Sequence, residues 1–169
     1  MEYPTPQVSK TIAMTTSDLE KLNTAVEFLI RQKTVLETIE RLDQEVDHSP
    51  EPFVWSVIEL NSIARPLPDT IKSCWIFVLK KNVPSGCHYH PNSIQHMVTI
   101  KGQGRQQIAG QSKRLVQFEW LIIDKNVPHE FFPEDENMVV ISFHTCEASE
   151  LEEIGCDTGQ QRLYTKGPS

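Results

Sequence analysis

Residues 86–90 read Gly86-Cys87-His88-Tyr89-His90, and a third histidine follows later in Val127-Pro128-His129. Successive side chains of a β-strand point to opposite faces, so His88 and His90 project from the same face. If the chain turns after His90 and enters a new strand, Gln95 can aim its amide oxygen at the same interior. A later strand carrying His129 would complete the group. Three imidazoles and an amide in this pattern predict a metal site.

The stretch resembles the first motif of the cupins, in which glycine, H-x-H, glutamate and a second glycine follow at short intervals. The matching positions here are Gly86, His88, His90, Gln95 and Gly102, with glutamine where the family usually has glutamate. The resemblance covers roughly residues 71 to 145. It implies a double-stranded β-helix, the jelly-roll or cupin barrel, with His88, His90, Gln95 and His129 as ligands of one divalent metal ion.

The second cupin motif corresponds to residues 118–129, with departures at three positions. Phe118 stands for the opening glycine, Asp124 for a proline, and Asn126 for the glycine that makes the turn. Asparagine tolerates positive φ better than most residues, so the turn remains plausible.

Gln95 bears on the chemistry, because a glutamine ligand leaves a divalent ion with its full charge, which favours anionic ligands. Imidazole suits several metals, so Fe, Zn, Ni and Mn remain open. Cupins with glutamine in this position include one that handles unsaturated uronates and a zinc-dependent polyketide cyclase, while some cupin dioxygenases use three histidines alone. Gln95 could also be a polar residue at the barrel mouth that does not touch metal.

The composition limits the classes of partner and compartment. A net charge of -7 over 169 residues argues against nucleic-acid partners and anionic membranes, and no apolar run is long enough to span a membrane. The four cysteines form no CxxC pair and are too sparse for a disulfide scaffold, so we expect free thiols. The N-terminus lacks the features of a signal peptide, and a cytoplasmic location is the simplest expectation.

The chain divides into an N-terminal arm and helical extension (1–52), a barrel (53–146) and a C-terminal tail (147–169). Residues 1–15 should be an extended arm or disordered. A capping box at Ser17 opens one long helix or two shorter ones that run to about Val46 and break near Gln32. The apolar helical stripe should pack on its own domain, with a homodimer interface or a cap over the barrel as alternatives. A short acidic helix is expected at 149–154.

The β-rich region predicts eight short strands, and parity within them suggests which residues line the cavity. The strands are expected at 54–60, 73–79, 87–90, 96–101, 105–108, 120–123, 129–132 and 139–144. His144 shares a face with Val140 and Ser142, which makes it a candidate catalytic acid/base or an extra ligand, or else a satisfied or exposed histidine without a role in the site. His96 should face away from Gln95. Candidates for the substrate pocket are Arg105, Phe131 and Trp75.

These observations predict a metal-dependent cupin that binds a small, oxygen-rich molecule such as a carboxylate, an enolisable ketone or a uronate. It could act as a dioxygenase, or as an isomerase, cyclase or lyase, since the sequence does not choose between redox and non-redox chemistry. The alternative is a non-catalytic module that binds a small molecule or a metal.

Overall fold

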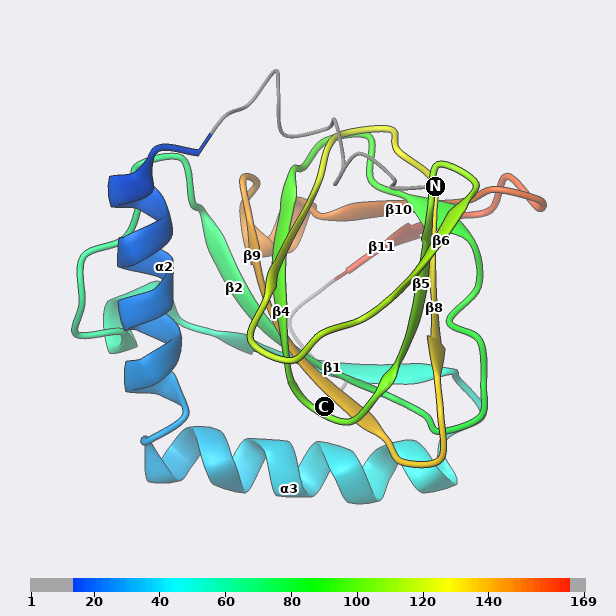
Figure 1. Cartoon of the computed structure of the whole chain (residues 1–169), viewed down its shortest axis with the longest axis horizontal. Helices are drawn as coiled ribbons and strands as arrows, with labels where there is room; N and C mark the ends of the chain where they lie inside the picture. Colours follow the sequence, from blue (N-terminus) through cyan, green and yellow to red (C-terminus); the bar gives the residue numbers. More distant parts are fainter. Residues whose placement is uncertain (1–13, 165–169) are drawn as a thin grey trace.

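The computed structural model describes residues 14–164, which form helices followed by two β-sheets (Figure 1). Most of the arm expected at residues 1–15 therefore lies outside the described residues. The helices are α2 (Thr16–Leu29) and α3 (Lys33–His48), and the strands are β1 (Phe53–Ile58), β2 (Ser73–Leu79), β3 (His88–Tyr89), β4 (Gln95–Lys101), β5 (Gly104–Ile108), β6 (Gln111–Arg114), β7 (Trp120–Ile123), β8 (His129–Pro133), β9 (Met138–His144), β10 (Glu152–Gly155) and β11 (Gln161–Leu163).

All the strand pairs are antiparallel, and the strands form a five-stranded and a six-stranded sheet. The first sheet has the order β1-β2-β9-β4-β7 and the second the order β11-β10-β3-β8-β5-β6. Neighbours in each sheet are mostly distant in sequence, as in a jelly roll. This arrangement is the double-stranded β-helix expected from the motifs, with the helical extension before it.

Both helices pack against the outer face of the five-stranded sheet (Figure 1). Leu22 of α2 and Leu42 of α3 are fully buried in the same cluster as Ile76 of β2 and Ile141 of β9. The helical stripe is thus covered by its own domain, as expected, and gives no argument for a dimer. Because helices cover one face of this sheet and the cavity lies on the other, β2 and β9 are buried on both faces.

The helical region forms two helices, one of the two alternatives that the sequence left open. The break lies at Gln32, whose backbone is extended at φ -80 and ψ 127. Helix α2 begins two residues before the predicted Ser17 capping box, because the Thr15 hydroxyl accepts a hydrogen bond from the Asp18 backbone N–H at 3.0 Å.

The C-terminal segment differs most from the prediction. The expected acidic helix at 149–154 is instead a single 3-10 turn, Ala148–Glu150, followed by strand β10. β10 pairs with β3, so the sheet that carries the histidines offers it an edge with unpaired backbone groups. Strand β6, a largely polar segment after the Ala109-Gly110 turn, was also missed.

Two cysteines form a disulfide, which corrects the expectation that all four are free. Cys87 and Cys156 are joined, with Cα atoms 5.4 Å apart, while Cys74 and Cys146 are free and buried. The pair is 69 residues apart in sequence, and only the β3–β10 pairing brings it together. Stable disulfides are rare in the cytosol. The expectation that all four thiols are free therefore no longer supports a cytoplasmic location. Among the described residues, no helix is long and apolar enough to cross a membrane.

Candidate metal centre

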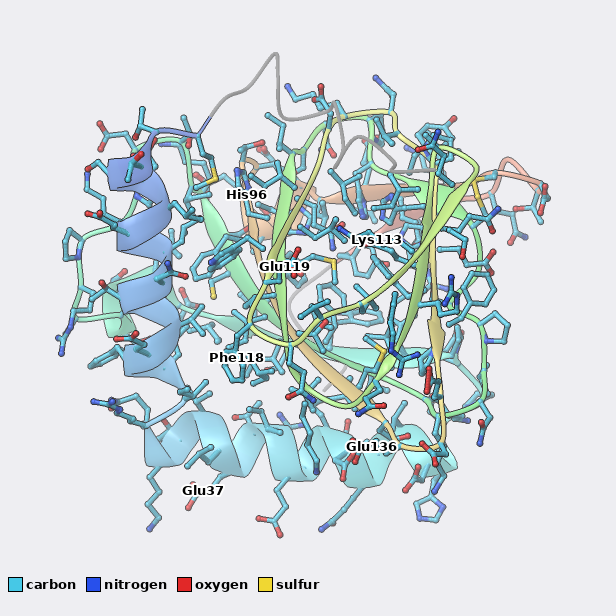
Figure 2. The ribbon with its side chains drawn as sticks, in the orientation of Figure 1. Glu37, His96, Lys113, Phe118, Glu119 and Glu136 are labelled. Carbon is cyan, nitrogen blue, oxygen red and sulfur yellow. A yellow bond between two sulfur atoms is a disulfide. The ribbon has the colours of Figure 1, made fainter. Side chains whose placement is uncertain are left out.

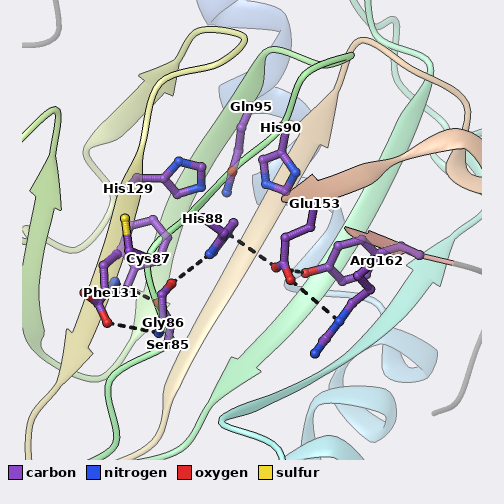
Figure 3. Close-up of polar contacts among 12 residues, drawn as sticks. Ser85, Gly86, Cys87, His88, His90, Gln95, His129, Phe131, Glu153 and Arg162 are labelled. Carbon is purple, nitrogen blue, oxygen red and sulfur yellow. Dashed lines mark hydrogen bonds and ion pairs between the residues drawn. The ribbon is translucent and has the colours of Figure 1, made fainter. Parts of the chain in front are cut away.

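Three histidines meet between the two sheets. His88 of β3 and His129 of β8 are direct register partners, so their side chains leave the same face of the six-stranded sheet. His90 follows β3 two residues after His88 and shares its parity. One ring nitrogen from each histidine lies within 4.8 Å of the others, and all three residues are buried. The structure therefore brings together the histidines that the motifs selected (Figure 3).

Backbone carbonyls fix the orientation of each imidazole. The Nδ1 atom of each ring lies close to one carbonyl oxygen. The distances are 2.9 Å from His88 to Gly86 O, 2.7 Å from His90 to Glu152 O, and 2.9 Å from His129 to Val127 O. A carbonyl oxygen can only accept, so Nδ1 carries the proton and Nε2 keeps its lone pair. A second hydrogen bond of this kind is the usual way in which proteins orient metal-binding histidines.

Gln95 enters from the opposite sheet. Its Nε2 lies 3.4 Å from both the Met97 sulfur and the Ser142 hydroxyl. Within residues 14–164, Gln95 Oε1 and His129 Nε2 are buried without a hydrogen-bond partner. Leaving such atoms unpaired is costly, whereas a cation bound between them would satisfy both. The three imidazoles and the amide oxygen thus fit a divalent metal.

Burial keeps the imidazoles of His90 and His129 neutral, as metal ligands must be. It lowers the pKa of His90 from 6.5 to about 3, with His88 adding a smaller repulsion. Burial also holds the pKa of His129 well below its usual value, followed by repulsion from His88 and His90. At neutral pH these nitrogens need not lose a proton before they bind a cation.

His144 lines the same pocket from β9, directly opposite Gln95 in the β4–β9 register. Its ring centroid is 5.4 Å from that of His90, and its Nδ1 lies 2.8 Å from the Ser93 hydroxyl. Its Nε2 is buried and unpaired within the described chain, and burial holds its pKa well below the usual value. His144 lies outside the group of three histidines.

The other candidate residues fall in different places. Phe131 lines the pocket from β8. Trp75 is fully buried on β2, where it stacks on Phe77 at an interplanar angle of 17° and lies edge-on to His144, but it is not among the residues that line the pocket. Arg105 does not lie in the pocket, because β5 alternates and turns it outward to the Ser112 hydroxyl at 3.4 Å. His96 points away from the centre, towards the side covered by α2 (Figure 2).

Apolar side chains form most of the remaining wall, and the cavity that they enclose is small, with a volume of about 40 Å³. That is space for roughly three water molecules beside the histidines. The walls include Phe53, Phe77, Leu79, Met97, Phe131, Val140 and Tyr164.

Sequence reasoning missed the contribution of the C-terminal strands. Glu153 Oε1 of β10 lies 3.7 Å from His88 Nε2 (Figure 3). Tyr164 lines the pocket and donates its hydroxyl hydrogen to the same oxygen at 2.5 Å. The alternation in Glu152-Glu153-Ile154 is too short to distinguish a strand from a helical turn, so the sequence held little signal for this contact.

Comparisons with known proteins agree with the barrel. The sequence matches the family described as the cupin domain over residues 75–144. No curated protein matches the chain.

Solved structures with the same fold include the coconut allergen cocosin, at 19% identity over 63% of this chain and 29% of that chain with a TM-score of 0.51. Recombinant pro-11S globulin of pumpkin matches at 22% identity over 63% and 29%, with a TM-score of 0.51. A salicylate 1,2-dioxygenase from Pseudaminobacter salicylatoxidans matches at 12% identity over 63% and 33%, with a TM-score of 0.50.

This chain therefore spans about a third or less of the length of these proteins, and at such identities the likeness shows the fold alone. The family match and the arrangement of the two sheets independently indicate a cupin barrel. Residues 75–144 of this chain match the cupin domain, and the described residues around them form the cupin barrel.

Proposed function

We propose that this protein is a mononuclear divalent-metal cupin that acts on a small, oxygen-rich molecule such as a carboxylate, an enolisable ketone or a uronate. One observation carries the proposal: three buried imidazoles converge with Nδ1 bonded to carbonyls, opposite the unpaired Gln95 Oε1. Such an arrangement has no role in a plain apolar core, where unpaired polar atoms cost stability.

In this proposal, Nε2 of His88, His90 and His129 and Oε1 of Gln95 would hold one ion of Fe, Zn, Ni or Mn. When bound, that ion supplies Lewis acidity towards a substrate oxygen and, if it is iron, redox chemistry as well. The aromatic and aliphatic walls lower the local dielectric constant, which strengthens electrostatic interactions inside the pocket.

His144 is the candidate acid/base group. It is neutral and buried, its Nδ1 is held by Ser93, and its unpaired Nε2 is free to exchange a proton with a bound molecule. The small cavity favours a compact substrate.

Two reaction classes remain within the proposal: oxygenation of the bound molecule, or its isomerisation, cyclisation or elimination without redox change. Because the salicylate dioxygenase shares only the fold with this chain, the reaction class must come from experiment. The alternative is a non-catalytic binding module.

The first test is metal analysis of protein purified without an affinity tag or added metal. About one transition-metal ion per chain is expected, and the His88→Ala, His129→Ala double variant should lose it. His48→Ala is the control, because His48 is exposed at the end of α3. Full metal content in the double variant would overturn the proposal.

Iron in the wild type directs the next assays to oxygen consumption with diketones or catechols. A redox-inert metal directs them to proton exchange on uronates. Binding without turnover in either assay identifies the non-catalytic module. A homodimer remains a further proposal, tested by light scattering.

A further inference from the structure

A carboxylate stands beside the histidines although no residue of the two sequence motifs supplies one. Glu153 Oε1 is 3.7 Å from His88 Nε2, and the side chains of these residues are only 13% and 11% exposed. Figure 3 shows Glu153 between His88 and Arg162. A cation bound at His88 Nε2 would interact with this partly buried carboxylate far more strongly than it would in water.

Strand pairing explains why Glu153 reaches the centre. In the β3–β10 ladder, Gly155 is the direct partner of His88. Glu153 precedes Gly155 by two residues, so it leaves the same face of the sheet and is the diagonal neighbour of His88. The disulfide from Cys156 to Cys87 fixes this register from one side.

The partners of Glu153 hold its carboxylate without covering the side towards His88. Arg162, its register partner on β11, approaches the other oxygen, with Nε 3.6 Å from Oε2. Arg162 is shared with Glu51, 3.3 Å away, so its charge is not devoted to Glu153 alone. Tyr164 donates to Oε1 and orients it.

Glu153 carries the negative charge that Gln95, a neutral residue in the position of the usual glutamate, does not bring to the site. A neutral amide in the glutamate position leaves a bound dication with no anionic ligand from β4, and a nearby carboxylate lowers the energy of that dication. We propose that Glu153 supplies this negative charge, making the C-terminal strand a part of the metal site that raises its affinity for a divalent cation. This inference rests on the proposed metal-binding function.

Adjacent residues on β10 offer a matched control. Glu152 precedes Glu153, and strand alternation directs its side chain to the opposite face. Only its backbone carbonyl serves the site, by accepting from His90 Nδ1. The variants Glu153→Gln and Glu152→Gln therefore remove the same charge from the same strand, and only the first removes it beside His88.

The experiment measures the dissociation constant of Zn²⁺ by competition with a chromophoric chelator, using the full chain with its disulfide intact. Glu153→Gln should weaken binding about 10-fold or more, as loss of an outer partner of a metal ligand does. Glu152→Gln should stay within about threefold of wild type, since its side chain leaves the opposite face of the strand and its backbone carbonyl is unchanged. Thermal unfolding of each metal-free variant checks that the fold is kept.

A charge swap separates an electrostatic role from a structural one. Gln95→Glu combined with Glu153→Gln returns one carboxylate to the centre, and the double variant should recover affinity to within about threefold of wild type. The Gln95→Glu single variant is the reference, because a purely structural role for Glu153 would make Glu153→Gln cost the same affinity in that background as in the wild type. Equal affinity in wild type and Glu153→Gln, or equal losses in Glu152→Gln and Glu153→Gln, would overturn the inference. Failure of the wild type to bind any metal would instead overturn the proposed function.

Discussion

Cys87 and Cys156 tie the residue before His88 to the strand that carries Glu153. The bond runs alongside two other links between the same segments, the β3–β10 ladder and the hydrogen bond from His90 Nδ1 to Glu152 O at 2.7 Å. The histidine pair and the C-terminal strand therefore form one mechanical unit. Loosening β10 should disturb the orientation of His90 and the position of Glu153 together.

Removing the disulfide should lower stability. The double variant Cys87→Ser, Cys156→Ser is expected to lose about 2 to 4 kcal/mol of unfolding free energy, because the unfolded chain is freed from a long loop. Urea denaturation measures the loss, and hydrogen exchange should rise first in β10. Dithiothreitol should destabilise the wild type and leave the variant unchanged. Equal midpoints for wild type and variant would show that the bond contributes nothing.

The clustering of the histidines could be predicted because it depends on residues that are close together in the sequence. His88 and His90 share a face by parity alone, and family motifs supplied Gln95 and His129 at the right spacing. The barrel followed from the same motifs. Parity likewise indicated that His144 points inward, and the structure has it in the pocket wall.

The missed features depend on contacts between distant segments. Glu153 meets His88 across 65 residues of chain, and Cys156 meets Cys87 across 69. Neither encounter leaves a periodic signal, because β10 has four residues and forms by adding to an edge supplied by β3. Arg105 was misjudged for a related reason: its parity could be assigned only once β5 was paired with β8.

Gln95 should contribute to metal affinity through its amide oxygen. Gln95→Ala is expected to weaken Zn²⁺ binding about 10-fold, since a ligand is lost and a void is left next to Ser142. Gln95→Glu should bind at least as tightly as wild type, because it adds an anionic ligand. Zinc competition titrations measure both. Unchanged affinity in Gln95→Ala would mean that Gln95 is a polar wall residue that does not touch the metal.

The metal-free protein should lose stability in acid. Burial lowers the pKa of His90 to about 3 and holds those of His129 and His144 well below 6.5. Below about pH 6.5 the unfolded chain takes up protons at these residues while the folded chain does not, so unfolding becomes easier as pH falls towards 3. Each such histidine lowers the free energy of unfolding by up to about 1.4 kcal/mol for every pH unit below 6.5.

Urea denaturation in the presence of a chelator at pH 7, 6 and 5 measures this dependence. The full contribution should be present above pH 6.5 and decline below it. The variant His144→Gln has one buried imidazole fewer, so its stability should fall less steeply with pH. A free energy of unfolding that is the same at pH 5 and pH 7 would contradict the prediction.

Phe118 occupies a backbone conformation that suits glycine. Its φ is +63°, in the left-handed region, and the second cupin motif usually has glycine at this position. The position is held in place because the Phe118 backbone N–H donates to Thr99 O at 2.9 Å. Its side chain is 56% exposed, so burial recovers little of the backbone cost. Asn126, also at φ +63°, is the residue type that tolerates this region better.

Phe118→Gly should therefore stabilise the protein by about 1 kcal/mol, because relief of the left-handed strain exceeds the extra entropy that glycine gains in the unfolded chain. Phe118→Ala is the matched control, since it removes the same ring but keeps the Cβ that causes the strain. Alanine should give no such gain, and urea denaturation of the three proteins measures the difference. Equal stabilities for the glycine and alanine variants would mean that the ring, rather than the backbone, determines the energy at this turn.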